Sequence, residues 1–222
     1  MYQLLLVGLL FLTGCDEPLV LGIEDVNVSE NKLFASAQAL RAGGDYAEAA
    51  VQFENFVGLF PFSDKKSEAN IRLMEIYDRQ GKYDDLESFS SELMNAGAST
   101  PQSVYYFAKA NLKLSHSEFF EKISAKMGGH DAVKLEKSKA AYEKLLGMKD
   151  IPVSMKKQVN MDYSQVCELI ADNHYRIGQF YLKKGKKKAA ELRFQKIKTS
   201  FPKTQAAKKL SHNQRSLTKR AD

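Results

Sequence analysis

The side chains that could carry out chemistry are few in this chain of 222 residues. It has two cysteines and four histidines, and the histidines have no spacing that suits a metal site. There is no HExxH helix, no paired CxxC, no glycine-rich phosphate loop and no GxSxG turn. The acid pair Asp84-Asp85 has no neighbour that would make it a catalytic dyad. We therefore expect a protein with no enzymatic activity, no bound metal and no separate cofactor.

Cys15 is the cysteine with a recognisable chemical context. An apolar block over residues 4–12 is too short to span a bilayer, and the run LTGC closes it at Cys15. This run resembles a bacterial lipobox, in which a signal peptidase cuts before the cysteine and the thiol receives a lipid such as palmitate. The resemblance implies a signal peptide over residues 1–14 and lipidation of Cys15, although no Lys or Arg precedes the apolar block.

The segment after the lipobox is expected to join the lipid to the folded part. Residues 15–30 are rich in acidic side chains and contain Pro18, so we expect a flexible tether here. The expected location is the periplasmic face of the outer membrane, reached through the lipid anchor. Asp16 follows the lipidated position, where aspartate retains some lipoproteins in the inner membrane, so that membrane stays open as the alternative.

Charge is divided unevenly along the chain. The whole chain has 33 basic and 27 acidic side chains, and residues 1–100 carry 7 of the basic and 16 of the acidic ones. Residues 101–222 therefore carry 26 basic and 11 acidic side chains. An acidic first half and a basic second half predict two surfaces with different partners. The densest lysines, over residues 183–188, suit either nucleic acid or a solvated helix end. The export signal favours the second, so we expect no nucleic-acid partner.

Two segments of the chain repeat the same pattern around Gly44 and Gly185. Relative to each glycine, a small residue stands at −7, alanine at +5, phenylalanine at +9 and proline at +17. This pattern resembles the tetratricopeptide repeat, a helix–turn–helix unit of about 34 residues. The small residues allow two antiparallel helices to approach closely, and the proline ends the second helix. The sequence therefore predicts an all-α solenoid.

The rest of the chain extends this pattern to four repeats. A degenerate unit centres on Gly81, and Thr100-Pro101 is expected to cap and open the first helix of a third unit. Its second helix is expected over residues 133–146, after an insertion that contains Gly128-Gly129. A continuous helical pattern then runs from about residue 154 to 184, and one basic helix over residues 206–217 caps the array. The expected division is repeats 1–3 over residues 31–149, and the long helix, repeat 4 and capping helix over residues 150–222.

A lipobox, an acidic segment and these repeats together resemble the YfiO (BamD) family of lipoproteins. The similarity covers residues 31–204 and is most specific at the FPFS corner over residues 60–63 and the FPKTQ run over residues 201–205. The resemblance implies a non-enzymatic scaffold of the β-barrel assembly (BAM) complex, which folds and inserts β-barrel proteins into the outer membrane. It also implies that the C-terminal repeats dock a POTRA domain of BamA and that the N-terminal repeats receive unfolded barrel proteins.

The resemblance assigns a partner-binding role to the helix after Gly185. Carried over by position, Arg193 falls where the family has an arginine that pairs with an acidic POTRA residue, and a guanidinium suits such a bidentate pair. Lys186 and Lys187 lie at the start of the same helix. The alternative is that Arg193 is one more solvated residue of a lysine-rich helix.

A groove for an extended peptide follows from helical spacing alone. Positions −10, −6 and −3 from each turn glycine share one helix face. Such a face mixes aromatic and charged side chains, which suits a peptide with an aromatic C-terminus, although aromatic residues at this spacing are also typical of a core. The residues are Phe34, Gln38 and Arg41, then Ile71, Glu75 and Asp78, then Tyr105, Lys109 and Leu112.

Two other binding functions stay open from the sequence. One is a pilotin-type repeat lipoprotein that escorts a secretin, and the other is a repeat protein that regulates periplasmic cell-wall enzymes. The family usually has a fifth full repeat, and this chain has a single helix in its place. Contacts with accessory lipoproteins therefore stay open too.

Overall fold

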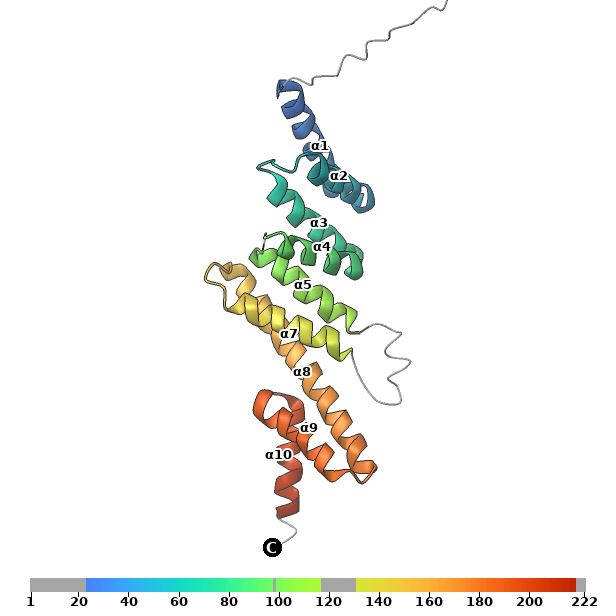
Figure 1. Cartoon of the computed structure of the whole chain (residues 1–222), viewed down its shortest axis with the longest axis vertical. Coiled ribbons are helices and arrows are strands. Elements are labelled where there is room, and N and C mark those ends of the chain that lie inside the picture. Colours follow the sequence, from blue (N-terminus) through green and yellow to red (C-terminus); the bar gives the residue numbers. More distant parts are fainter. Residues whose placement is uncertain (1–22, 98, 117–130, 219–222) are drawn as a thin grey trace, which may run out of the picture.

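The computed structural model describes residues 23–97, 99–116 and 131–218, which form nine helices and no strand. The all-α class is therefore confirmed. The helices shown in Figure 1 are α1 (Ile23–Gly43), α2 (Tyr46–Leu59), α3 (Lys66–Gln80), α4 (Tyr83–Asn95), α5 (Pro101–Leu114), α7 (Ala132–Leu146), α8 (Val153–Lys183), α9 (Lys187–Ser200) and α10 (Gln205–Thr218).

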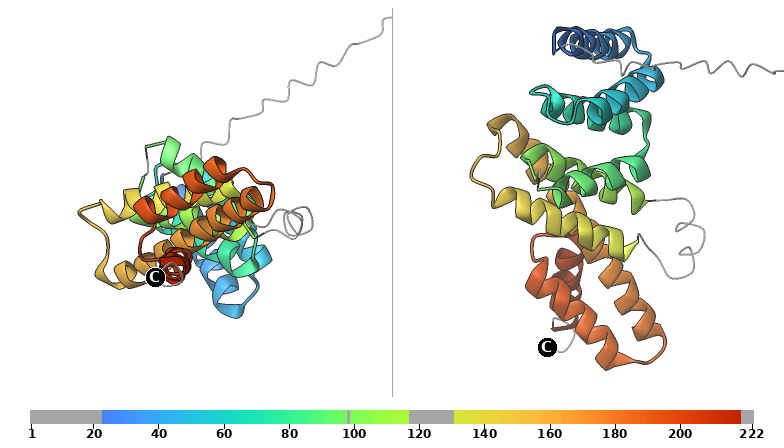
Figure 2. Two further views of the ribbon diagram at one scale, coloured as in Figure 1. Left: turned by 90° about the horizontal axis from the view of Figure 1, so that it is seen from below. Right: turned by 45° about the horizontal axis from the view of Figure 1, so that its top comes forward.

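The helices stack along one long axis. Each helix packs mainly against the next one in the chain, and α10 packs on both α8 and α9. Figures 1 and 2 show α1 at one end of this stack and α9 with α10 at the other. Contacts between distant segments are few, which is the architecture of a tetratricopeptide-type solenoid and confirms the predicted fold.

The repeat positions have the roles that their chemistry predicts. Gly44 and Gly185 occupy the turns with φ of 92° and 70°, in the left-handed region that glycine adopts without strain. Helices α2 and α9 end at Leu59 and Ser200, two residues before their prolines. Ala37 and Ala49 are fully buried where α1 and α2 meet.

Gly178 marks a close helix approach in the C-terminal part. A Cβ at this position would lie 2.3 Å from a ring carbon of Phe194, so the ring of α9 rests directly on the backbone of α8. The sequence predicted a close approach of these helices from the small residues at −7 and +5.

Two hydrophobic cores run through the solenoid and meet at α5. The first comprises buried side chains of α1–α4 and also includes Ala110 of α5. The second includes Val104, Ala108 and Leu112 of α5 and continues through α7–α10. One helix therefore contributes to both cores, which makes the N-terminal and C-terminal repeats a continuous support for the sites that they carry.

The long helix α8 belongs to two repeats at once. Its 31 residues match the predicted continuous helix and span about 46 Å. It contacts α7 and α5 on one side and α9 and α10 on the other. A helix of this length fixes the orientation of the fourth repeat relative to the third.

The start of the folded part differs from the expected boundary at residue 31. Helix α1 begins at Ile23, so the backbone of residues 23–30 is helical rather than an extended tether. Glu30 accepts a hydrogen bond from the Ser63 hydroxyl at 2.8 Å, which ties this part of α1 to the α2–α3 corner. Cys15, Asp16 and the Gly128-Gly129 insertion lie outside the described residues.

The third repeat begins with the predicted cap. The Thr100 hydroxyl accepts a hydrogen bond from the Ser103 backbone N–H, and the Ser103 hydroxyl accepts one from the Thr100 backbone N–H. Pro101 occupies the first helical position, where no backbone donor is needed. This reciprocal cap confirms the assignment made from the Thr-Pro pair.

Gly178→Ala is expected to destabilise the fold by about 1–3 kcal/mol, because the added methyl group overlaps the Phe194 ring. Urea unfolding followed by circular dichroism measures the change. Gly58→Ala is the matched control: Gly58 is an exposed helical residue with nothing within 4 Å of its Cβ position, so alanine should stabilise α2 by about 0.5–1 kcal/mol. Equal effects of the two changes would contradict the close approach.

Glu87 of α4 forms ion pairs with Lys134 and Lys137 of α7, and we expect this contact to weaken in acid. Burial raises the pKa of this carboxyl, but hydrogen bonds and charges from Lys134 and Lys137 outweigh burial and leave the pKa below its usual range. A lowered folded-state pKa stabilises the protein above the unfolded-state pKa, and the stabilisation is lost as pH falls through the folded-state pKa. Glu87→Gln should therefore lower the Tm at pH 7 and not at pH 3.

Glu92→Gln is the control for this prediction, because Glu92 is exposed on the same helix and has no ion pair among the described residues. Thermal unfolding at both pH values should show little change in this variant. A Tm difference for Glu87→Gln that persists at pH 3 would show that the ion pairs are not its cause.

Candidate functional site

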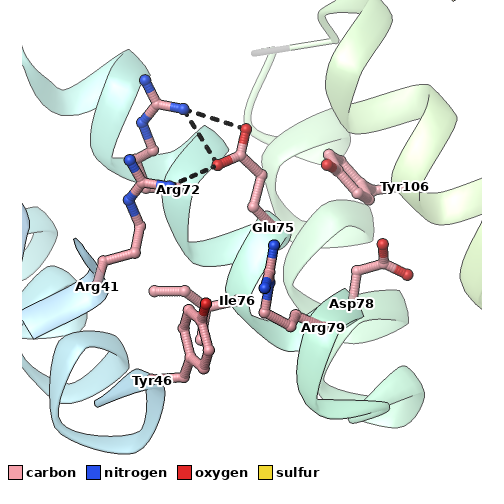
Figure 3. Close-up of a pocket in the computed structure, with 8 residues that line it drawn as sticks. All are labelled: Arg41, Tyr46, Arg72, Glu75, Ile76, Asp78, Arg79 and Tyr106. Carbon is pink, nitrogen blue, oxygen red and sulfur yellow. Dashed lines mark hydrogen bonds and ion pairs between the residues drawn. The ribbon is translucent and has the colours of Figure 1, made fainter. Parts of the chain in front are cut away.

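A polar pocket lies where the first two repeats meet. It has a volume of about 640 Å³ and is formed by side chains of α1, α2, α3 and α5. Figure 3 shows three guanidinium groups and two tyrosine rings around it. We call it the arginine pocket; its lining residues are Arg41, Tyr46, Arg72, Glu75, Ile76, Asp78, Arg79 and Tyr106.

Glu75 is the central acceptor of the arginine pocket. Its carboxylate pairs with the Arg72 guanidinium at 3.1 Å and with that of Arg41 at 3.7 Å. Arg72 also pairs with Glu68 at 3.2 Å, and Gln38 donates a hydrogen bond to Glu68. Burial lowers the pKa of Arg72, but the two glutamates outweigh it and raise that pKa overall. These contacts hold two arginines in fixed positions at the pocket wall.

Arg79 is the third cation of the pocket and is held differently. Its guanidinium lies over the Tyr46 ring at 5.0 Å from the ring centroid, and it forms no ion pair within the described ranges. Tyr106 closes the far side, where burial and the charges of Glu75 and Asp78 raise its pKa to about 12. The pocket therefore combines an unpaired guanidinium with a neutral phenol, an arrangement that can bind a carboxylate next to an aromatic side chain.

A second polar cavity lies between α5 and α8. Asp78 and Lys109 pair at 2.5 Å and connect α3 with α5. Beyond this pair, a cavity of about 510 Å³ is lined by Tyr105, Lys109 and Leu112 of α5 and by α8 residues. Asp162 of α8 accepts hydrogen bonds from Tyr105, Tyr142 and Gln158. Burial first, and then the Asp162 charge, raises the pKa of Tyr105.

The groove residues expected from spacing divide among several environments. Arg41, Glu75 and Asp78 line the arginine pocket, and Tyr105 lines the next cavity. Phe34 instead packs on Phe53 and Phe56, with ring centroids 5.9 and 5.1 Å apart, so the structure places it against the core. Phe34 therefore fits the alternative interpretation, in which an aromatic residue at helical spacing belongs to the core and not to a binding groove.

Spacing missed five residues of the arginine pocket. The predicted face of α3 comprised Ile71, Glu75 and Asp78. The face that lines the pocket also includes Arg72, Ile76 and Arg79, so it is centred about one residue further along the helix. Ile71 lies in a separate small cavity. Tyr46 and Tyr106 come from α2 and α5, so only the packing of neighbouring helices brings them to α3. The Arg72–Glu75–Arg79 spacing on one helix was the signal available in the sequence.

Arg193 lies at the opposite end of the solenoid. It is half-buried on α9, and its Nη1 lies 3.5 Å from Nδ1 of His174 on α8. Burial, followed by the charges of Arg193 and Lys196, lowers the pKa of His174, so the imidazole is neutral at pH 7. No carboxylate of the described residues lies within ion-pair distance of Arg193. Its neighbour Leu192 is 73% exposed, and Lys186 and Lys187 are exposed at the start of α9.

Comparison with known families decides what kind of protein carries these surfaces. The model of the YfiO family, described as an outer membrane lipoprotein family, matches residues 26–220. This chain belongs to the YfiO family. No curated protein matches it.

Membership in the YfiO family supports association with the outer membrane, and the family is one of lipoproteins not known as enzymes. In the described part of this YfiO protein, no helix is both long and apolar enough to cross a bilayer. Nor does any group of three His, Cys, Asp or Glu side chains there have the geometry of a metal site. Cys167 is half-buried, and burial raises the pKa of its thiol.

Lys109→Met should destabilise this YfiO protein by about 1 kcal/mol, because it leaves the partly buried Asp78 carboxylate without its cation. Lys113→Met, one turn further along α5, changes an exposed lysine that has no ion pair in the described ranges and should have little effect. Urea unfolding compares the two variants with the wild type. Similar losses in both would show that the Asp78–Lys109 pair does not join the repeats.

Proposed function

We propose that this YfiO protein is a non-enzymatic scaffold of the β-barrel assembly complex. In this role, the basic C-terminal repeats bind a POTRA domain of BamA, and the N-terminal repeats receive unfolded β-barrel proteins. The observation that carries the proposal is Arg193, a half-buried guanidinium with no carboxylate partner among the described residues. A cation in this state is stabilised when a partner supplies an acidic side chain.

The surroundings of Arg193 support docking to an acidic protein surface. Leu192 offers exposed apolar area next to the charge, which is the composition of an interface anchor with a polar rim. The neutral His174 is within hydrogen-bond distance of Arg193 Nη1 but brings no negative charge to balance the guanidinium, so an acidic partner would supply it. Lys186 and Lys187 add positive charge that would speed the encounter with an acidic partner more than it strengthens the final complex.

The arginine pocket supports the second half of the proposal. It carries three cations and two carboxylates within a half of the chain that is acidic overall. Arg79 over Tyr46 offers a guanidinium edge to a peptide carboxylate and a ring to an aromatic side chain. An unfolded barrel protein with an aromatic C-terminal residue presents both groups together.

The lipid completes the proposed arrangement. Lipidation of Cys15 would hold the chain at the periplasmic face of the outer membrane, on the side of α1, which is the first helix that the structure describes. Asp16 keeps the inner membrane as the alternative location. A pilotin-type role with a secretin and a role in regulating cell-wall enzymes remain the alternative functions, and both predict no binding to a POTRA domain.

Arg193→Glu should abolish capture of the POTRA domains of the same organism in a pull-down with the mature chain, because two like charges would then face each other. Circular dichroism should show unchanged helix content. Lys149→Glu is the control: it makes the same charge change at an exposed position in the α7–α8 turn, and binding should persist.

If the Arg193→Glu variant still binds the POTRA domains, they are a partner of the chain but the interface does not lie at Arg193 on α9. Absence of binding by the wild type at low salt would contradict the scaffold role and favour the secretin or cell-wall alternatives.

A further inference from the structure

The corner between α2 and α3 carries an exposed group of apolar side chains. Phe62 is 98% exposed, and Leu59, the last residue of α2, is 69% exposed. Pro61 between them is exposed as well. We call Leu59, Pro61 and Phe62 the apolar tip. Single exposed apolar side chains are common on protein surfaces, whereas three at one turn form a patch that binding can remove from water.

The chain holds this tip in a defined turn. The Ser63 backbone N–H donates to the Phe60 carbonyl at 3.1 Å, and the Lys66 backbone N–H donates to the Ser63 carbonyl at 3.0 Å. Phe60 packs on Phe56 of the core, with ring centroids 5.4 Å apart. Phe62 is therefore exposed on an ordered turn, and the isolated chain leaves its hydrophobic surface in water.

Polar contacts tie this corner to helix α1. The Ser63 hydroxyl donates a hydrogen bond to Glu30 at 2.8 Å. Lys65 pairs with Glu30 at 3.8 Å and donates a hydrogen bond to Asn31. Figure 1 shows the start of α1 and the α2–α3 corner at the same end of the stack. The apolar tip is therefore held beside the helix that follows the N-terminal segment.

The number of residues before α1 limits the distance between this corner and a lipid on Cys15. Eight residue steps lead from Cys15 to Ile23, and they span at most about 29 Å when fully extended. Seven further steps along α1 lead to Glu30 and add about 10 Å. The contact between Glu30 and Ser63 therefore lies within roughly 40 Å of the lipidated residue, which is less than the length of α8.

We propose that the apolar tip inserts into the surface of the phospholipid bilayer that holds the lipid anchor. The proposal rests on the lipid anchor of the proposed function and adds a second, non-covalent membrane contact to it. Phenylalanine and leucine are side chains that interfacial segments bury at the boundary between headgroups and acyl chains. Lys66, next to the tip, can lay its methylene groups on apolar surface and keep its ammonium among the headgroups.

The charges of the corner indicate that insertion depends on apolar surface. Lys65 is paired with Glu30, and Asp64 and Lys66 add one charge of each sign. With these charges balanced, anionic lipid and salt should affect the contact little. A lipid alone leaves the orientation of the solenoid undefined, whereas a second contact on an ordered corner sets it and holds the N-terminal repeats at the bilayer.

The test uses tryptophan fluorescence, because the natural chain has no tryptophan. Phe62→Trp places an indole at the tip. Val153→Trp is the matched control: Val153 is 82% exposed in the α7–α8 corner, which lies further along the stack from α1. Each lipidated chain is purified from membranes and reconstituted in phosphatidylcholine vesicles with or without brominated acyl chains. Brominated lipids should quench the Phe62→Trp variant at least about twice as strongly as the Val153→Trp variant, because only the tip reaches the acyl chains.

A second substitution in the Phe62→Trp chain tests the composition of the tip. Leu59→Ser should weaken the quenching, because it removes the other large apolar side chain of the tip. Val51→Ser makes the same kind of change at a residue of α2 that is 52% exposed and two turns away, and it should leave the quenching unchanged. All these positions are exposed, and circular dichroism should show the same helix content throughout.

Equal quenching of Phe62→Trp and Val153→Trp would overturn the proposal. Quenching that requires phosphatidylglycerol and disappears in salt would overturn it too, because it would show adsorption by charge. If the Phe62→Trp emission changes only after POTRA domains or an unfolded barrel protein are added, the tip contacts a protein and the proposal is wrong.

Mass spectrometry of the membrane-purified chain separates failure of the tip from failure of the anchor. If Cys15 carries no lipid, the anchor and this proposal fail together. If Cys15 is lipidated and the tip is not quenched, the anchor stands and the tip alone fails. The POTRA pull-down uses no membrane, so the scaffold role is decided independently of both results.

Discussion

Close approach of neighbouring helices at small residues is the constraint on which this molecule depends. Ala37 and Ala49 are fully buried where α1 meets α2, and Gly178 lets the Phe194 ring rest on the backbone of α8. In a solenoid each helix pair is oriented by its neighbours, so a change in one approach propagates along the stack. The pockets exist because side chains from two to four helices reach the same place.

The arginine pocket shows how local charge can oppose the overall charge of a region. The first hundred residues are acidic, yet the pocket contains more cations than carboxylates. Glu75 holds Arg41 and Arg72 at the wall, and Asp78 is occupied by Lys109, which leaves Arg79 unpaired within the described ranges. Net charge describes the approach of a partner, whereas the pairing of individual side chains determines which group remains available to bind it.

The long helix α8 connects the two surfaces physically. Its first half contributes Asp162 to the cavity beside α5, and its second half carries His174 beneath Arg193. The shared core at α5 and the length of α8 therefore make a continuous support between the arginine pocket and the surface around Arg193, the two sites of the proposed function. A scaffold that receives one protein and docks another requires such a fixed separation, and no catalytic group is needed for it.

The sequence alone determined the helices and their order. Turn glycines, small residues at close approaches, terminating prolines and the Thr100-Pro101 cap are local signals, and each acts within one helix pair. It could not determine where α1 begins, because acidic residues with one proline suit a tether as well as an exposed helix. Only tertiary structure decided the site: the packing of α1, α2 and α5 against α3 brought Tyr46 and Tyr106 to the pocket that Arg79 lines. The packing of α1 on α2 placed Phe34 against the core. Helical spacing gives the face of one helix to within about one residue, whereas a pocket depends on the rotation of several helices about their axes, which their mutual packing sets.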